Sequence, residues 1–395
     1  MRAFEQTHPW LSFELRADRL SRFAWMLTGE ARSKCEHIND APLHPEVASR
    51  LHSLYLSKGA AATTAIEGNT LTEDEVRQRI DGTLSLPPSR EYLGIEVDNI
   101  VAACNDIQED VAAGREFKLE PDRILAFNRQ VLANLELTEG VIPGEYRTHS
   151  VLGGGIYRGA PAEDCEYLMS RMCEWLNGPV FFSDDADMAF ASQLARAILA
   201  HLYIAWIHPS GDGNGRTARL VELQILLHSG YVSTPAAHLL SNHFNLTRSR
   251  YYEQLDSASK GANGVTSFIE YATRGFVDGL WWQFKEIREQ QLVVSWRDVI
   301  IGHFHTLHGK TADRQRRLLL DLRMPTPRRG ITHVSPRVAE LYAGLSDKTL
   351  ARDLAALEAA GLIAREDELI APNFGLVLEL LPLRANGAPA ADPAS

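Results

Sequence analysis

A glycine-rich segment, His208–Arg219, joins a long apolar stretch to a second helical stretch, and it constrains the fold more than any other feature of the chain. Before it, residues Asp187–Ile207 are apolar on nearly every face, which predicts a buried, central helix. His208-Pro209 then ends that helix, because the residue before a proline is biased away from helical geometry. The sequence therefore predicts two helices joined by a tight loop within a mainly α-helical fold.

The side chains of this loop are suited to chemistry on a nucleotide. Its three glycines let the backbone turn and approach a ligand closely, and the unpaired N–H groups that open a helix favour anions. Arg216 and Arg219 share one face of the following helix and can grip phosphate oxygens. Asp212 is an oxygen ligand of the kind that Mg²⁺ takes together with phosphates. His208 is placed to take a proton from a hydroxyl group.

Other phosphate and metal motifs fit this chain less well. The glycines are not followed by Gly-Lys-Ser/Thr, so the loop is not a P-loop. A calcium loop would carry a bidentate Glu where Val221 stands. Neither an HExxH sequence nor paired CxxC sequences are present, so the sequence gives no support for zinc.

The segment resembles the signature of the Fic family, H-P-F-x-D/E-G-N-G-R-x-x-R, whose members transfer AMP from ATP to a protein hydroxyl. It departs from that pattern at Ser210, which replaces a Phe, and this change is expected to loosen the loop. The resemblance implies that His208 is the general base and that Asp212 holds Mg²⁺. It also implies a nucleotide-binding set consisting of Gly211, Gly213, Asn214, Gly215, Arg216 and Arg219.

A second motif lies upstream, at Thr63–Gly68. Taken alone it is an ordinary helix end, capped by Gly68 or Asn69. It resembles the Fic inhibitory motif, S/T-x-x-x-E-G/N. The resemblance implies that Glu67 pairs with Arg219 and blocks the seating of the γ-phosphate, as in the class with an N-terminal inhibitory helix.

Short β-prone runs flank three glycines between Gly144 and Pro161, which indicates either a hairpin or an irregular loop. In Fic enzymes a hairpin flap at this position holds the target by strand pairing. The resemblance implies a target-docking flap at Ile156, Tyr157 and Arg158. The sequence leaves open which residues contact adenine.

The last hundred residues differ in composition. Residues 280–308 are predicted to form a connecting helix, and residues 310–330 carry seven Lys or Arg against two Asp. Ser346–Ala360 reads as a capped helix followed by a β-like pair, and this pattern resembles a winged helix-turn-helix. DNA binding, protein docking and dimerisation remain open for this module.

The composition limits the class of protein. The net charge of −11 argues against a protein that coats nucleic acid. The four cysteines lack paired spacing and read as reduced thiols, and no apolar signal core or membrane-length apolar run is present. A cytoplasmic protein without membrane contact is therefore expected. The predicted domains are an N-terminal helical region with the inhibitory motif (1–110), a Fic catalytic core (111–290), a linker helix with a winged helix (291–385) and a disordered tail (386–395).

Together these features predict a mainly α protein with a Fic helical core, a β-hairpin flap and a C-terminal winged helix. Its expected reaction is transfer of AMP from Mg-ATP to a Ser, Thr or Tyr hydroxyl of a target protein or of itself, restrained by Glu67. The alternatives are transfer of another nucleotide or phosphate-bearing group, removal of AMP, a DNA-binding regulator with a vestigial core, and an interaction scaffold.

Overall fold

The computed structural model describes residues 2–43, 45–153, 157–261 and 263–378. It divides into two compact units, Met1–Phe284 and Lys285–Ser395, here called the N-terminal and C-terminal units. The regions predicted separately as 1–110 and 111–290 therefore lie within one unit, apart from the last few residues. The predicted tail, 386–395, lies outside the described residues.

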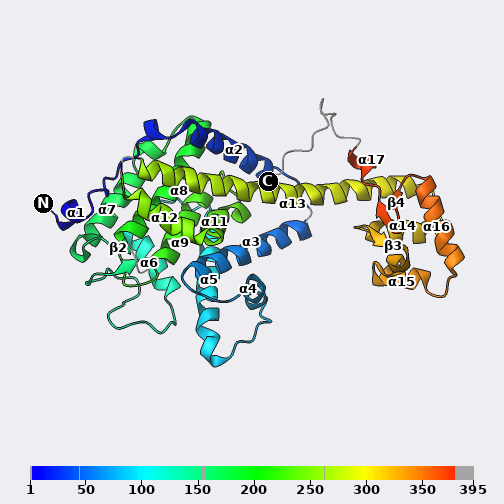
Figure 1. Cartoon of the computed structure of the whole chain (residues 1–395), viewed down its shortest axis with the longest axis horizontal. Helices are drawn as coiled ribbons and strands as arrows, with labels where there is room; N and C mark the ends of the chain where they lie inside the picture. The colour runs from blue at the N-terminus through cyan, green and yellow to red at the C-terminus, as the bar shows by residue number, and fades with distance from the viewer. Residues whose placement is uncertain (1, 44, 154–156, 262, 379–395) are drawn as a thin grey trace. The chain divides into compact units, whose positions relative to one another are not determined.

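The N-terminal unit is built from helices, with one small hairpin (Figure 1). Its helices are α1 (Ala3–Thr7), α2 (Arg22–Asn39), α3 (Pro45–Ile66), α4 (Glu73–Ile80), α5 (Glu91–Ala112), α6 (Pro121–Val131), α7 (Cys165–Leu176), α8 (Ala186–Ile207), α9 (Asn214–His228), α10 (Thr234–Ala237), α11 (Leu239–Leu246) and α12 (Arg248–Ala258). The hairpin consists of β1 (Leu152–Gly153) and β2 (Tyr157–Arg158).

The core of this unit is the packed pair α8 and α9. Helices α5, α6 and α10 also pack against α9, and helices α2 and α7 pack against α8. Helix α3 packs on α4, α5, α10 and α11 and also reaches α9, so the inhibitory motif at its end comes close to the signature loop. Nearly every residue of α8 from Gln193 onward is buried, as the all-round apolar sequence predicts. By length and composition α8 could also cross a membrane, but 78% of its apolar window is buried inside the structure.

Several predicted local features are confirmed. Helix α8 starts one residue before the predicted stretch and ends, as predicted, at Ile207. The hairpin, rather than the irregular loop, is present: Leu152 lies opposite Arg158, and the Gly159 N–H donates to the Val151 carbonyl at 3.2 Å.

The connecting helix predicted at residues 280–308 begins earlier in the structure than the sequence indicated. Helix α13 runs from Gly264 to Phe304. Its first half carries Phe268, Ala272 and Phe276 at a spacing of four, and all three are fully buried. This apolar stripe makes the first half a core helix of the N-terminal unit, in addition to the predicted connection.

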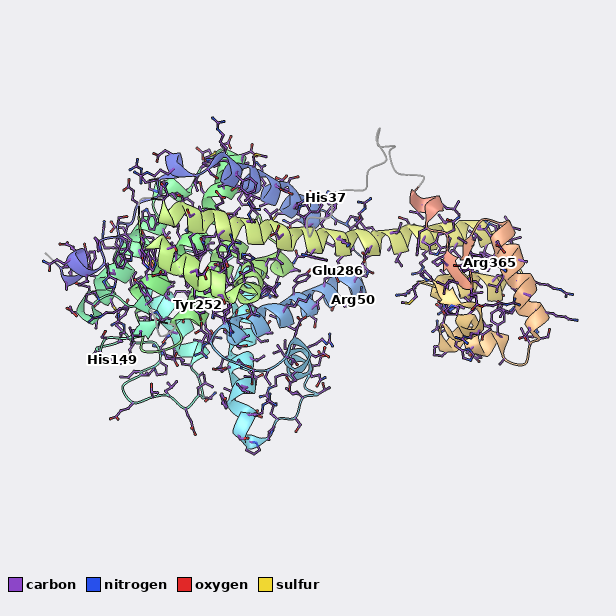
Figure 2. The ribbon with its side chains drawn as sticks, viewed as in Figure 1. His37, Arg50, His149, Tyr252, Glu286 and Arg365 are labelled. Carbon is purple, nitrogen blue, oxygen red and sulfur yellow. The ribbon has the colours of Figure 1, made fainter. Side chains whose placement is uncertain are left out.

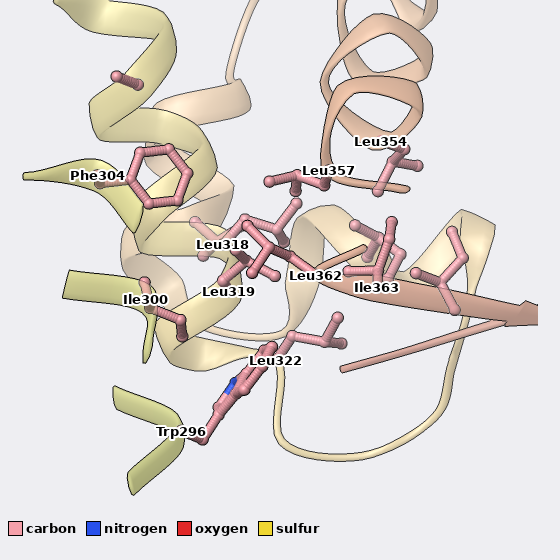
Figure 3. Packing of buried hydrophobic residues seen from close by; sticks show 14 of the residues in the cluster. Trp296, Ile300, Phe304, Leu318, Leu319, Leu322, Leu354, Leu357, Leu362 and Ile363 are labelled. Atoms are coloured by element: carbon pink, nitrogen blue, oxygen red, sulfur yellow. The ribbon is translucent and has the colours of Figure 1, made fainter. Parts of the chain in front are cut away.

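The C-terminal unit contains helices α14 (Lys310–Asp321), α15 (Pro336–Tyr342), α16 (Asp347–Ala359) and α17 (Gly375–Leu378), and strands β3 (Thr326–Pro327), β4 (Ile363–Glu366) and β5 (Leu369–Pro372). The strands form an antiparallel sheet in the order β3-β5-β4. Side chains of α13, α14 and α16 meet in its hydrophobic core, which includes Phe304, Leu318 and Leu357 (Figure 3). The predicted helix and β-like pair are present, and strand β3 is a third strand that the sequence did not predict. The winged-helix assignment itself remains a prediction.

Candidate active site

The signature loop is shaped by two residues in left-handed backbone conformation. His208 follows the last turn of α8 with φ 51° and ψ 58°, and Gly213 precedes α9 with φ 75°. Such a conformation is costly for most residues and easy for glycine. The loop thus leaves α8 abruptly and enters α9 with the free N–H groups of its first turn at the loop.

Asn214 holds the loop closed. Its side chain accepts a hydrogen bond from the Ser210 N–H at 2.9 Å and donates to the Ser210 carbonyl at 2.8 Å. The Asn128 side chain, from α6, donates to the Asp212 carbonyl at 2.8 Å. Ser210 is buried, and its backbone N–H and carbonyl are both hydrogen-bonded to the Asn214 side chain. The expected loosening of the loop at Ser210 is therefore offset at the backbone, and Asn214 serves the loop as well as its predicted phosphate role.

Arg147 fastens the loop to the base of the flap, and sequence reasoning missed it. Its Nε donates to the His208 carbonyl at 2.7 Å, and its backbone N–H donates to the Pro209 carbonyl at 2.9 Å. The remaining guanidinium nitrogens donate to the carbonyls of His149, Ala160 and Ile207. Only the buried position of this side chain reveals its role, because its partners are backbone oxygens that no sequence motif marks.

His208 has one ring nitrogen available as a base. Its Nδ1 lies 3.2 Å from the Ala205 carbonyl oxygen. Because a carbonyl can only accept, that nitrogen carries the proton, and Nε2 keeps its lone pair. Burial lowers the pKa of His208 below its ordinary value of 6.5, with the nearby carboxylates of Glu67 and Asp212 acting in the opposite direction. The imidazole is therefore neutral at pH 7, which is the state that a general base requires.

Glu67 and Arg219 meet across the site. Glu67 Oε1 lies 2.6 Å from Arg219 Nη2, and the same nitrogen donates to the Thr63 carbonyl at 2.9 Å. The Arg219 side chain is 1% exposed, whereas that of Glu67 is 32% exposed. Burial opposes ionisation of Glu67, but the Arg219 guanidinium outweighs it and lowers the pKa of the carboxyl. A Cβ on Gly215 would lie 2.0 Å from Glu67 Oε1, so the close approach of Glu67 needs a glycine there.

The first signature arginine, Arg216, has a carboxylate partner that the sequence did not suggest. Its Nη1 donates to Glu96 Oε1 at 3.0 Å, and Asp212 Oδ1 lies 3.7 Å from its Nη2. The Nε and Nη1 of Arg219 and the Nε of Arg216 are buried without a hydrogen-bond partner among the described residues. Buried donors without partners are uncommon, and here they are donors that phosphate oxygens can satisfy.

A cavity of about 470 Å³ opens beside these groups. The predicted residues Glu67, His208, Gly215 and Tyr157 line it. The rest of its wall comes from α3, α8 and α12. Helix α3 contributes Ile66 and α8 contributes Ala205 and Trp206. The residues from α12 are Ser249, Tyr251, Tyr252, Glu253, Leu255 and Asp256. Flat aromatic walls suit a nucleobase, and a cavity of this size suits a small ligand.

Tyr251 and Tyr252, whose roles the sequence left open, both belong to this wall. Tyr252 is labelled in Figure 2, and its hydroxyl donates to the Ile66 carbonyl at 3.3 Å. Tyr251 is buried and bonds His201 Nε2 at 2.8 Å, while His201 Nδ1 bonds Glu222 at 2.9 Å. The pocket wall is thus tied both to the inhibitory segment and to the centre of the α8–α9 pair.

Asp212 fits the metal role that the resemblance implies. Its side chain is 55% exposed, so it is open to a ligand. Within the described ranges, no group of three or more His, Cys, Asp or Glu side chains could hold a metal. A single carboxylate suits Mg²⁺ that is shared with nucleotide phosphates, because this ion commonly keeps water and phosphate oxygens in its shell.

The flap is only partly described. Ile156 lies outside the described residues. Tyr157 reaches the cavity wall, and the Arg158 carbonyl lies 2.9 Å from Nε2 of His8, which belongs to the N-terminal segment. The structure therefore brings Tyr157 to the site and shows a contact between the flap and His8 that the sequence did not predict.

Residues 118–226 match the model of the Fic/DOC family. This segment of the chain is therefore a Fic/DOC domain. Protein adenylyltransferase fic-1 of Caenorhabditis briggsae is 31% identical over 54% of this chain and 38% of its own length. Protein adenylyltransferase Fic of Culex quinquefasciatus is 30% identical over 64% of this chain and 46% of its own length. The chain thus spans less than half the length of either relative.

The fold of the chain is also found in solved structures. A Fic-domain signalling protein from Bacteroides thetaiotaomicron has a TM-score of 0.53 at 22% identity, covering 66% of this chain and 98% of that one. The likeness supports the mainly α Fic fold described above.

Proposed function

We propose that this chain is a protein adenylyltransferase, which transfers AMP from Mg-ATP to a Ser, Thr or Tyr hydroxyl and releases pyrophosphate. The observation that carries the proposal is the cavity in which His208, Gly215 and the α12 tyrosines meet. It combines a neutral base, a phosphate-binding helix start and an aromatic wall. Relatives that are 31% and 30% identical to parts of this chain are named protein adenylyltransferases.

In the proposed reaction, Nε2 of His208 takes the proton of the incoming hydroxyl. The oxygen attacks the α-phosphorus, and the bond from that phosphorus to the pyrophosphate oxygen breaks. Arg216 and Arg219 bind the outer phosphates and stabilise the charge that develops on the leaving group. Asp212 would hold Mg²⁺, which neutralises phosphate charge when bound. The proton on His208 then passes to solvent.

The target segment would pair with the flap strand, whose residues Tyr157 and Arg158 lie next to the cavity or its rim. Strand pairing uses backbone groups, so it tolerates many target sequences. Glu67 would restrain the reaction by occupying Arg219. The four cysteines are free and buried, which supports a reducing, cytoplasmic location.

Labelled nucleotides test the proposal. Purified full-length chain and its Glu67→Gly variant are incubated with ATP, GTP, CTP and UTP, each labelled at the α-phosphate, with and without cell lysate. Mass spectrometry of labelled bands should show an added AMP on a hydroxyl side chain, and His208→Ala should reduce labelling by roughly 10²–10⁴-fold. Labelling from another nucleotide alone would replace ATP as donor, and no labelling from any would overturn the proposal.

A further inference from the structure

Glu96, on α5, is the hydrogen-bonding partner of Arg216. The side chain of Glu96 is 16% exposed and that of Arg216 is 5% exposed. The contact from Asp212, at 3.7 Å, is too long for a hydrogen bond. A guanidinium removed from water needs a paired charge, and Glu96 supplies it.

The other carboxylate oxygen of Glu96 faces the inhibitory segment. Its Oε2 accepts a hydrogen bond from Asn69 Nδ2 at 2.8 Å. Asn69 is 7% exposed, donates also to the Leu93 carbonyl at 2.9 Å, and accepts from the Leu71 N–H at 2.9 Å. Since Asn69 stands two residues after Glu67, one carboxylate links the turn after the inhibitory helix to a signature arginine.

Two acids therefore hold the two arginines, but their positions differ. Glu67 lines the cavity and lies where a ligand would enter. Glu96 is not among the cavity-lining residues, and it bonds Arg216 only through Nη1. The Nε of Arg216 is left buried and unpartnered among the described residues. Glu96 thus fixes one nitrogen of the guanidinium and leaves others for an anion.

We propose that Glu96 is a positioning residue for phosphate binding. It keeps Arg216 oriented towards the nucleotide phosphates, and through Asn69 it couples that orientation to the turn that carries the inhibitory Glu67. The ligand's identity as ATP rests on the proposed function; the positioning role rests on the contacts alone. The competing role, a second inhibitory carboxylate, predicts the opposite effect on ATP binding.

The test uses the full chain with Glu67→Gly, so that inhibition by Glu67 does not mask the effect. Glu96→Gln keeps the shape of the side chain and removes its charge. The matched control is Asp98→Asn on the same helix, where Asp98 pairs with Arg79 at 2.7 Å, not with a signature residue. Calorimetric titration with Mg-ATP measures binding without requiring transfer.

Glu96→Gln should weaken ATP binding by roughly ten- to a hundredfold, the range for losing a charged hydrogen bond, and Asp98→Asn should not change it. Adenosine, which lacks phosphates, should bind both variants equally. Tighter or unchanged ATP binding by Glu96→Gln would overturn the proposal. An equal loss of adenosine binding would mean a structural role only. If Glu96→Gln does not fold, Glu96→Asp is tested by the same two titrations.

The two proposals fail separately. If the Glu67→Gly chain binds ATP but transfers no AMP, the proposed reaction is wrong, while the effect of Glu96 on phosphate binding can still be measured. If AMP is transferred and Glu96→Gln binds ATP as tightly as its parent, the positioning role is wrong and the reaction stands.

Discussion

At the scale of single residues, His208 owes its readiness as a base to its surroundings. Its own backbone carbonyl is held by Arg147, its Nδ1 faces the Ala205 carbonyl, and the neighbouring carboxylates are Glu67 and Asp212. Burial favours the neutral imidazole, and the carboxylates oppose this preference without overcoming it. Catalysis should therefore depend on pH in a definite direction.

The acid limb of kcat/KM for AMP transfer should have its midpoint below 6.5, the ordinary value of a histidine pKa, because kcat/KM reports the free enzyme. A lowered pKa keeps the imidazole deprotonated at lower pH, so activity is lost only when the pH falls through that lowered value. The measurement uses Glu67→Gly, in which one carboxylate that raises the pKa is gone. A midpoint above 6.5 would contradict the neutral-base assignment.

Arg147→Ala should destabilise the N-terminal unit and abolish transfer. The loop and flap carbonyls that it binds would lose a charged donor, at a cost of about 1.5–3 kcal/mol for a hydrogen bond of this kind. Chemical denaturation measures the change in the free energy of unfolding. The control is Arg115→Ala, whose side chain is 68% exposed. Equal stability of the two variants would remove Arg147 from the support of the loop.

The residues that the sequence identified differ in kind from those that it missed. His208, Asp212 and Glu67 occupy fixed places in contiguous motifs, so spacing alone could indicate them. Arg147 acts through backbone oxygens, and Glu96 acts through two side chains distant in sequence, Arg216 and Asn69. Their roles exist only in the folded chain, and no periodicity in the sequence encodes these contacts.

At the scale of elements, the end of α3 and the start of α9 form an autoinhibitory pair in our proposal. ATP must compete with the Glu67 carboxylate for Arg219. Glu67→Gly should therefore raise AMP transfer by about tenfold or more, the equivalent of one charged hydrogen bond. Adding Arg219→Ala should cancel the gain, because the γ-phosphate needs the same arginine. A double-mutant cycle on initial rates measures this coupling.

Glu73→Gly is the control for this cycle, since Glu73 is an exposed acid in the first turn of α4. It should leave the rate unchanged. If Glu67→Gly is no faster than the parent chain, autoinhibition is wrong, and Glu67 becomes a candidate for activating water in AMP removal.

Element prediction succeeded where local signals were strong and failed where packing decided. The buried α8 and the hairpin followed from the apolar pattern and from the β-prone runs around the glycines. The early start of α13 did not follow from the sequence. The burial of Phe268 and Phe276 in the core identifies this part of α13 only in the folded structure. The register of β3 with β5 likewise depends on a contact between residues more than forty apart, Thr326 and Ile370.

At the scale of the whole molecule, the site lies entirely within the N-terminal unit, and the C-terminal unit has its own hydrophobic core. Truncation at Lys310, where the basic stretch begins, would expose Trp296 and Phe304 of that core. A chain ending at Glu289 avoids this, and it should transfer AMP at the rate of the full chain. A lost rate in a folded truncation, judged by its thermal unfolding, would show that the C-terminal unit takes part in the reaction.

The last prediction concerns the partner of the C-terminal unit. In the sequence of α16 three acids, Asp347, Asp353 and Glu358, argue against phosphate binding, but the structure changes that balance. Asp353 is buried and accepts hydrogen bonds from Arg314, Gln315 and Tyr342. Glu358 pairs with Arg365 at 2.9 Å. Lys348 and Arg352 remain exposed one helical turn apart.

The exposed charge of α16 is therefore less acidic than its sequence, although Asp347 is also exposed, and we propose DNA as the partner of this unit. The full chain should shift duplex DNA in a gel at low salt, and the affinity should fall steeply as salt rises. Replacing Lys348 and Arg352 with Ala should weaken binding and reduce the salt slope by about two, one for each lost phosphate contact. Replacing the exposed Arg16 and Arg115 of the N-terminal unit is the charge-matched control. If no DNA is bound at low salt, protein docking is the better account of this unit, because its basic surface then has no nucleic-acid ligand.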